Sequence, residues 1–283
     1  MMRKQISILA LLLSVLCSCE TVIELDLPGH EPRLVVNSVI NPDSAFVVDV
    51  SASQSAFSAG AHQPITNAMV QVYQAGQLVS SLQSIGNGKY TSDQKPQPLQ
   101  HYTMQVSAAG FTTVDAATFV PASPIIRDLR AARVAPAADM YEETTAASFI
   151  LADNPEQDNF YYIQAYTPDT TYEGKAYRRS VNMEFTAPFE EEFTMEDRYF
   201  FSDKLFNGKS VPLELHLQNL PANTTYVRVA HITPEYYHYV RTLEKQSYKD
   251  NFSTTPESVA NNIKNGIGIF AGYHVVTLAV KVK

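Results

Sequence analysis

Residues 64–92 read PITNAMVQVYQAGQLVSSLQSIGNGKYTS, and this stretch indicates the fold class. Its apolar side chains alternate with polar ones, so that Val70 and Val72 share one face. Successive side chains of a strand point to opposite faces, so the alternation predicts strands with one face towards a core and one towards water. The turn residues Ala75-Gly76 and Gly86-Asn87-Gly88 separate these strands.

Strand-like segments of the same kind recur on both sides of this stretch. They cover residues 34–40, 45–53, 68–74, 77–83, 88–92, 101–108 and 111–120. Seven short strands with turns every 8–12 residues predict an all-β sandwich.

The same block resembles the immunoglobulin-like and transthyretin-like modules of bacterial surface proteins. The residues that carry this resemblance are Pro64, Ala68, Tyr90, Tyr102 and the turn Gly110-Phe111. The resemblance implies that the two tyrosines are packing and corner residues rather than binding residues.

The composition changes to Ala, Pro and Arg over residues 121–141. We therefore predict a linker at 128–145, between an N-terminal immunoglobulin-like β-sandwich at 33–127 and a β-rich domain at 146–283. Ile125 and Ile126 form the last edge strand before the linker in this interpretation.

The second half is again β-rich but contains one helical pattern. Thr233, Pro234 and Glu235 suit the first positions of a helix, and the apolar residues that follow have helical spacing. A helix is predicted near 234–247. A shorter copy of the pattern at 255–259 predicts a second turn or helix.

The N-terminus has the three parts of a secretory signal, namely positive charge, a short apolar run and a small residue at its end. Leu16-Cys17-Ser18-Cys19 resembles the end of a bacterial lipoprotein signal. It implies a signal peptide at 1–18, lipidation of Cys19 and a tether at 19–32. The alternatives are an ordinary signal peptide or an uncleaved anchor. A redox pair and a zinc site are disfavoured, because Cys-x-Cys is one residue short of the redox spacing and a zinc site would need further ligands nearby.

Charge and cysteine content limit the function classes. The formal net charge is −8, and removal of Arg3 and Lys4 with the signal would make it −10. Such an acidic chain does not suit nucleic-acid binding. After Cys19 there is no cysteine, so the domain would be stabilised by its core rather than by disulfides.

No catalytic, cofactor-binding or metal-binding residues are predicted. The chain lacks a Gly-x-Ser-x-Gly nucleophile motif, and its seven histidines do not have metal-site spacing. Residues 153–159 have oxygen ligands but not the pattern of a calcium loop, so a solvated turn is favoured. Glu190-Glu191-Glu192 suits a hydrated loop. Gly266 and Gly268 suit a close approach of two backbones or a bulge.

Residues 236–239 read YYHY within the predicted helix. Tyr236 and Tyr239 would share the buried face with Val240, whereas Tyr237 and His238 would be half exposed. Core packing is favoured over a partner site, although exposed aromatic residues are enriched at interfaces. Asp43-Ser44-Ala45 and Asp169-Thr170-Thr171 resemble bacterial O-glycosylation signals, and their modification is left open.

Several segments together resemble a Bacteroidetes lipoprotein family, domain-of-unknown-function family 4249. They are CETVIELDLP at 19–28, LVVNSVINPDSAFVVDVS at 34–51, PITNAMVQVY at 64–73, FSDKLFNGK at 201–209, ITPEYYHYVRTLEKQ at 232–246 and PESVANNIKNGIGIFAGY at 256–273. The resemblance implies an outer-membrane lipoprotein that assists a TonB-dependent β-barrel transporter, with an unknown ligand. Glu20, Glu24 and Asp26 are too dispersed to decide between a cell-surface and a periplasmic orientation.

We therefore expect a non-enzymatic accessory or ligand-capturing partner of an uptake system. A structural or adhesive cell-surface protein is the alternative, followed by a hydrolase whose site is assembled from distant residues.

Overall fold

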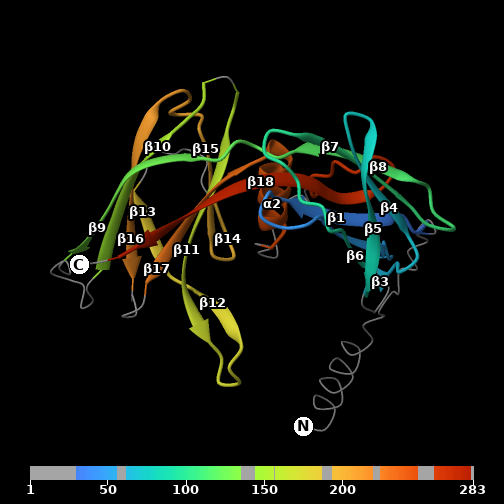
Figure 1. Cartoon of the computed structure of the whole chain (residues 1–283), viewed down its shortest axis with the longest axis horizontal. Coiled ribbons are helices and arrows are strands. Elements are labelled where there is room, and N and C mark those ends of the chain that lie inside the picture. Colours follow the sequence, from blue (N-terminus) through green and yellow to red (C-terminus); the bar gives the residue numbers. More distant parts are fainter. Residues whose placement is uncertain are drawn as a thin grey trace, which may run out of the picture. The chain divides into compact units, whose positions relative to one another are not determined.

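A computed structural model describes residues 30–55, 62–134, 144–155, 157–186, 193–218, 224–247 and 258–281. Within these ranges the chain forms 18 strands and one helix, so the predicted mainly β class is confirmed (Figure 1). Residues Pro32–Lys283 form one compact unit. The signal peptide, Cys19 and most of the tether lie outside the described residues, as do Glu190-Glu191-Glu192 and the start of the second helical pattern.

The first half contains eight strands. They are β1 (Leu34–Ile40), β2 (Val47–Ala52), β3 (Gln63–Pro64), β4 (Met69–Gln74), β5 (Gln77–Gly86), β6 (Lys89–Thr91), β7 (His101–Ser107) and β8 (Val114–Phe119). They follow the order β1-β2-β6-β5-β4-β7-β8 within a larger sheet, and β3 pairs with β2. The predicted strands at 34–40 and 45–53 therefore exist, and the alternation around Val70 and Val72 places both side chains in the core.

The long strand β5 joins two layers around the first core. Its start pairs with β4 and its end pairs with β6. Tyr90 is buried between the layers, where its hydroxyl donates to Ile65 O at 2.7 Å and accepts from Ala68 N at 2.8 Å. Tyr102 is also buried and accepts from Gln97 N at 2.8 Å. The predicted packing and corner roles of both tyrosines are confirmed.

The described residues of the predicted linker at 128–145, namely 128–134 and 144–145, are instead strand. The edge strand β9 (Ile125–Val134) pairs with β10 (Thr144–Ala152), and a bulge lies opposite Ser148 and Ile150. The Ala- and Arg-rich composition suggested a linker, but a strand at an exposed sheet edge can carry mainly small and polar side chains. Residues 135–143 are outside the described part of the chain.

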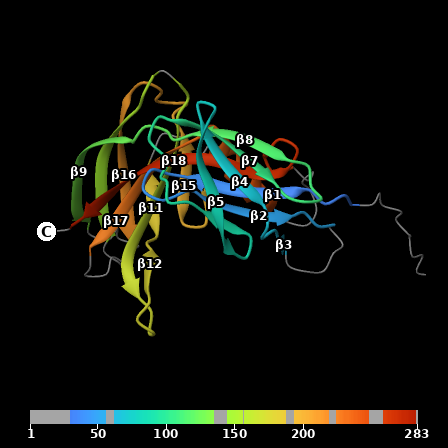
Figure 2. The ribbon, with the colours of Figure 1, turned by 45° about the vertical axis from the view of Figure 1, so that its right-hand side comes forward.

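The second half adds the remaining strands. They are β11 (Phe160–Thr170), β12 (Ala176–Ser180), β13 (Met183–Thr186), β14 (Phe193–Met195), β15 (Arg198–Ser202), β16 (Ser210–Gln218), β17 (Thr225–Ile232) and β18 (Ile267–Val280). The four-stranded sheet β13-β16-β10-β9 encloses a second core together with β11, β15, β17 and the end of β18. Strands β11 and β12 form a hairpin that reaches beyond their neighbours (Figures 1 and 2).

The last strand, β18, belongs to both halves. Its first six residues pair in parallel with β1, and its last eight pair antiparallel with β17. Phe270 lies in the first core and Val280 in the second. The predicted division at 33–127 and 146–283 therefore separates β1 from its partner strand. Local composition cannot reveal this pairing, since the partners are more than 200 residues apart.

Glycines allow β18 to approach its neighbours closely. Gly268 has φ +123°, and a Cβ there would lie 2.1 Å from Val36 O. A Cβ on Gly272 would lie 1.9 Å from Phe119 O of β8. The close approach predicted for the glycine pair at 266–268 is confirmed.

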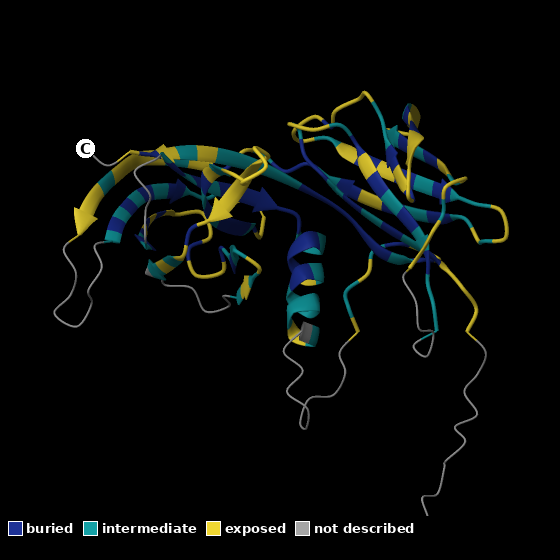
Figure 3. Ribbon diagram, turned by 90° about the horizontal axis from the view of Figure 1, so that it is seen from below, coloured by how far each residue is buried: buried dark blue, intermediate teal, exposed yellow. Residues whose placement is uncertain are grey.

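The helix α2 (Pro234–Ser247) occupies the predicted position and packs on the sheet (Figure 3). Thr233 was predicted as its N-cap, and its hydroxyl accepts a tertiary hydrogen bond from Gly272 N at 3.3 Å. The predicted half-exposure of Tyr237 is wrong, because Phe160 and Phe193 pack on its ring and only 1% is exposed. The helix is buried on two sides, whereas the spacing of its apolar residues predicted a single buried face. His238 is exposed.

Candidate ligand-binding site

A pocket of about 250 Å³ lies between α2 and the sheet, and we call it the aromatic pocket. It is lined by Asn37, Val39, Met195, Glu196, Arg198, Phe200, Tyr236, Tyr239, Val240, Leu243 and Ile269. Most of these side chains are apolar or aromatic, and a few polar groups converge among them, which is the usual composition of a small-molecule site.

The hairpin of β14 and β15 supplies the polar wall of the aromatic pocket. Glu196 and Asp197 form its turn, and Glu196 has a left-handed φ of 55°. The turn places Met195, Glu196 and Arg198 beside one another at the pocket, facing the side chains of α2. Phe193 of β14 stacks on its cross-strand partner Phe200 of β15, with ring centroids 5.0 Å apart, and this contact holds the two strands of the hairpin together.

Arg198 is the central charged group of the aromatic pocket. Its Nη1 donates to the Tyr236 hydroxyl at 2.8 Å, its Nη2 donates to Glu196 Oε2 at 2.5 Å, and its guanidinium lies 5.9 Å from the Tyr162 ring centre. Burial lowers the pKa of Arg198, but Tyr236 and Glu196 favour the charged form and raise the pKa above its ordinary value. The pocket therefore holds a permanent, oriented cation.

Asn37 of β1 contributes a second polar group. Its Oδ1 is buried and, among the residues that the structure describes, has no hydrogen-bond partner. A Cβ on Gly268 would lie only 2.9 Å from this oxygen, so the amide stands against the backbone of β18. The arrangement can hold an apolar ligand body and orient one polar group.

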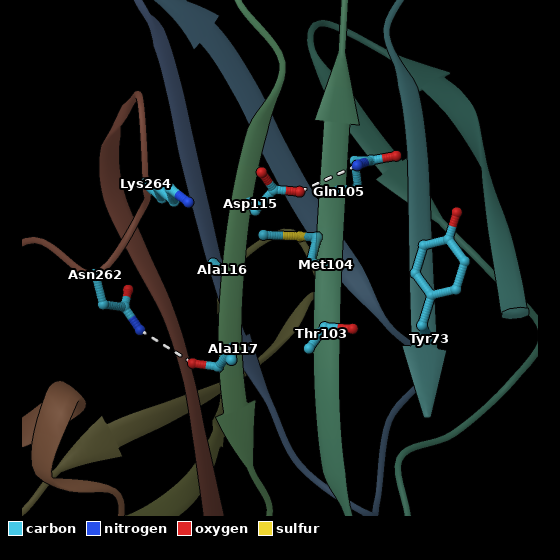
Figure 4. Close-up of a pocket in the computed structure, with 9 residues that line it drawn as sticks. All are labelled: Tyr73, Thr103, Met104, Gln105, Asp115, Ala116, Ala117, Asn262 and Lys264. Carbon is cyan, nitrogen blue, oxygen red and sulfur yellow. Dashed lines mark hydrogen bonds between the residues drawn. The ribbon is translucent and has the colours of Figure 1, made fainter. Parts of the chain in front are cut away.

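A second, shallower hollow of about 420 Å³ lies on the outer face of β4, β7 and β8 (Figure 4). Tyr73 stands at one side, and Asn262 and Lys264 stand at the other. Its polar groups bond to one another, since Gln105 donates to Asp115 at 3.1 Å and Asn262 donates to Ala117 O at 3.4 Å. Together with the bridge from Asp115 to Lys264, these bonds cover the edge of β8. We therefore take the aromatic pocket as the candidate site.

The histidines lie apart from the aromatic pocket. His30 and His62 precede strands, and the others lie on β7, β16, β17, α2 and β18 (His101, His216, His231, His238 and His274, in this order). In the described ranges no group of three His, Cys, Asp or Glu side chains could hold a metal ion.

His231 and His216 are sheet residues, and each has a ring nitrogen close to a polar partner. His231 is buried, and its Nδ1 lies 3.1 Å from Ala122 O. Burial lowers the pKa of His231 to about 4. His216 Nε2 lies 3.0 Å from Glu214 Oε1 on the outer face of β16.

The segment predicted as a solvated turn, residues 153–159, is bound into the core at both ends. Asp153 accepts from the Tyr161 hydroxyl at 2.7 Å and from Gly208 N at 2.8 Å. Asn159 is fully buried and donates to Asp203 Oδ2 at 3.2 Å. These carboxylates fasten the turn at 203–209 to the sheet, a contact that the sequence did not indicate.

Sequence reasoning noted Tyr236 and Tyr239 but missed Asn37, Glu196 and Arg198. Asn37 lies about 160 residues before Glu196 and Arg198, and it meets them only through the pairing of β1 with β18 and the packing of α2. The turn residues Glu196 and Asp197 beside Arg198 were the one local signal.

No helix in the described part of the chain is long and apolar enough to cross a membrane. No curated protein matches the chain. The model of one family, described as "Domain of unknown function (DUF4249)", matches residues 20–279. This match covers nearly the whole chain, and the protein therefore belongs to the DUF4249 family.

Proposed function

We propose that this protein is a lipid-anchored, non-enzymatic accessory that captures a small ligand for a TonB-dependent transporter of the outer membrane. The aromatic pocket is the single observation that carries the ligand-capturing part. Its walls come from two strands, a hairpin and a helix that pack on one core, so the site is formed before a ligand arrives.

The anchoring part rests on the Leu16-Cys17-Ser18-Cys19 pattern. Acylation of Cys19 with more than one chain would hold the protein on the membrane, because each buried CH₂ contributes about 0.8 kcal/mol. Replacing Cys19 by Ala should release the protein into the soluble fraction on cell lysis. Retention of the Cys19→Ala protein in washed membranes would contradict the lipid anchor.

The partnership is tested by purification of the native lipoprotein in mild detergent. A large β-barrel protein should accompany it in stoichiometric amounts. Recovery of the lipoprotein alone, together with normal growth of a deletion strain on every scarce nutrient tested, would contradict an accessory role in uptake.

The role of the aromatic pocket is tested by filling it. On a scarce nutrient, a strain that carries Leu243→Trp on α2 should grow no better than the deletion strain, because the larger ring occupies the ligand's space. The barrel should still co-purify with this variant. Lys245→Trp, on the exposed side of the same helix, is the matched control and should behave like the wild type.

One observation favours a second candidate function, adhesion to another surface. The β11–β12 hairpin carries a fully exposed Tyr172 at its turn and Arg178 above the Tyr166 ring. Tyr and Arg are enriched at protein interfaces. Loss of surface adhesion in a Tyr172→Ser variant with normal uptake would favour this alternative.

A further inference from the structure

We propose that the aromatic pocket binds an apolar monocarboxylate, and that the Glu196 carboxylate is an internal substitute that this ligand displaces. The inference rests on the proposed ligand-capturing function and names the ligand class. The inference follows from a difference within the Arg198–Glu196 ion pair: Arg198 is the more buried of the two and is held by further contacts.

Arg198 is held in place independently of Glu196. Its side chain is 28% exposed, it donates to the Tyr236 hydroxyl, and it lies near the face of Tyr162. Tyr236 is itself buried at the base of α2. The guanidinium would therefore keep its position and its charge if Glu196 moved away.

Glu196 is held weakly by comparison. Its side chain is 65% exposed, and exposed ion pairs stabilise a protein little, because water solvates both charges well. The residue lies in a turn with left-handed backbone, and its carboxylate accepts one hydrogen bond from Arg198 Nη2. A ligand carboxylate can take over the same guanidinium, since Arg binds carboxylates in a planar, two-pronged geometry.

The remaining wall selects the body of the ligand. Val39, Met195, Val240, Leu243 and Ile269 line the pocket next to the ring of Tyr239. These apolar side chains offer no hydrogen bonds and Asn37 offers one acceptor oxygen, so a sugar or a peptide backbone would lose most of its hydration without compensation. An aliphatic chain or an aromatic ring would instead be removed from water.

Charge balance limits the head group to a single negative charge. Asp197 Oδ1 lies 4.0 Å from Arg198 Nε, and hydrogen bonds from Ser180 and Gln164 outweigh its desolvation and lower its pKa. Asp197 therefore remains charged beside the site. A monocarboxylate that replaces Glu196 leaves this balance unchanged, whereas a phosphate dianion would be repelled by Asp197 and a cation by Arg198.

The test uses the full-length mature lipoprotein in zwitterionic nanodiscs and three probes of one shape. They are 4-phenylbutyrate, 4-phenylbutanol and 4-phenylbutylamine, titrated by calorimetry with empty nanodiscs as the blank. We expect 4-phenylbutyrate to bind at least about tenfold more tightly than the alcohol, as expected for a hydrogen bond between charged groups. The amine should bind most weakly.

Variants assign the effect to the two residues. Arg198→Gln should weaken 4-phenylbutyrate binding about tenfold or more and leave 4-phenylbutanol binding unchanged. Glu196→Gln should strengthen 4-phenylbutyrate binding several-fold by removing the competing carboxylate. Arg127→Gln, an exposed arginine on β9, is the matched control and should change neither probe. A gain of affinity in Glu196→Gln cannot result from misfolding.

Equal binding of the acid and the alcohol, or unchanged acid binding in Glu196→Gln, would overturn the monocarboxylate assignment. Absence of binding by all three probes to both the wild type and Glu196→Gln would also overturn it. None of these three results affects co-purification with a barrel, which tests the proposed function separately. Conversely, carboxylate binding by a lipoprotein that never co-purifies with a barrel would retain this inference and reject the transporter partnership.

Discussion

At the scale of single residues, the buried carboxyl group of Asp203, at the start of the 203–209 turn, has a strongly raised pKa. Desolvation raises the pKa of Asp203 from its ordinary value of 3.8 to about 6, and the adjacent Asp153 adds to this increase. The folded protein therefore binds a proton at Asp203 more tightly than the unfolded chain does. The stability that this proton contributes is fully present below pH 3.8 and is lost as the pH rises through about 6.

Asp203→Asn should remove this pH dependence, because the amide mimics the protonated acid. Its oxygen can still accept from Asn159, and its NH₂ group can donate to Asp153. We expect the free energy of unfolding of the wild type, relative to the variant, to fall by about 1–2 kcal/mol between pH 4 and pH 7. Urea unfolding at several pH values measures the difference. A difference independent of pH would show that Asp203 keeps an ordinary pKa.

His231 has the opposite dependence and must be separated from Asp203. Its pKa is lowered from 6.5 to about 4, so the folded protein binds its proton less tightly than the unfolded chain does. The stability contributed by neutral His231 is present above pH 6.5 and is lost as the pH falls through about 4. In the wild type, the pH dependence of stability from His231 therefore partly cancels that from Asp203. Because Asp203→Asn retains His231, the difference between the two proteins isolates the contribution of Asp203.

At the scale of elements, β18 depends on residues without side chains. Gly272 lies where β18 passes β8, and an added Cβ would be 1.9 Å from Phe119 O, a backbone atom that cannot rotate away. Gly272 also donates to the Thr233 hydroxyl that precedes α2. Three elements therefore meet at one position that only glycine fits.

Gly272→Ala should lower the free energy of unfolding by about 3 kcal/mol, because β8 must move away from β18 and the packing of the first core loosens. Thermal and urea unfolding measure the change. Thr277→Ala, an exposed position on the same strand, is the control and should stay within about 0.5 kcal/mol of the wild type. An equally small effect at Gly272 would mean that β8 and β18 do not approach closely.

For the helix α2, the local sequence pattern predicted some features and could not predict others. Pro234 and the spacing of Tyr236, Tyr239 and Val240 predicted its position and one buried face. They could not predict the burial of Tyr237, because the residues that cover it, Phe193 and Phe160, come from strands 44 and 77 residues earlier. The aromatic pocket escaped prediction for the same reason.

At the scale of the whole molecule, the two halves share one strand. The segment predicted as an independent sandwich, residues 33–127, lacks the parallel partner of β1 and also lacks Phe270, which is fully buried in the first core. Without β18 it would expose the edge of β1 and leave a cavity the size of an aromatic ring.

A fragment of residues 32–127 should therefore not fold by itself, whereas residues 32–283 should unfold in one cooperative transition. Two-dimensional ¹H–¹⁵N NMR distinguishes the two outcomes, because an unfolded fragment gives poorly dispersed amide signals. A dispersed spectrum of the fragment would contradict the structural role of β18 in the first core.

The sequence by itself determined the mainly β class, the strands around residues 34–53 and 68–108, the helix at 234–247 and the family. These features depend on side-chain alternation, helical spacing and turn residues, all of which act between near neighbours in the chain. The tertiary structure alone decided the sharing of β18, the strand at the predicted linker and the meeting of Asn37, Arg198 and Tyr236. Pairing between distant strands is fixed by closure of a common core, and no short segment carries that information.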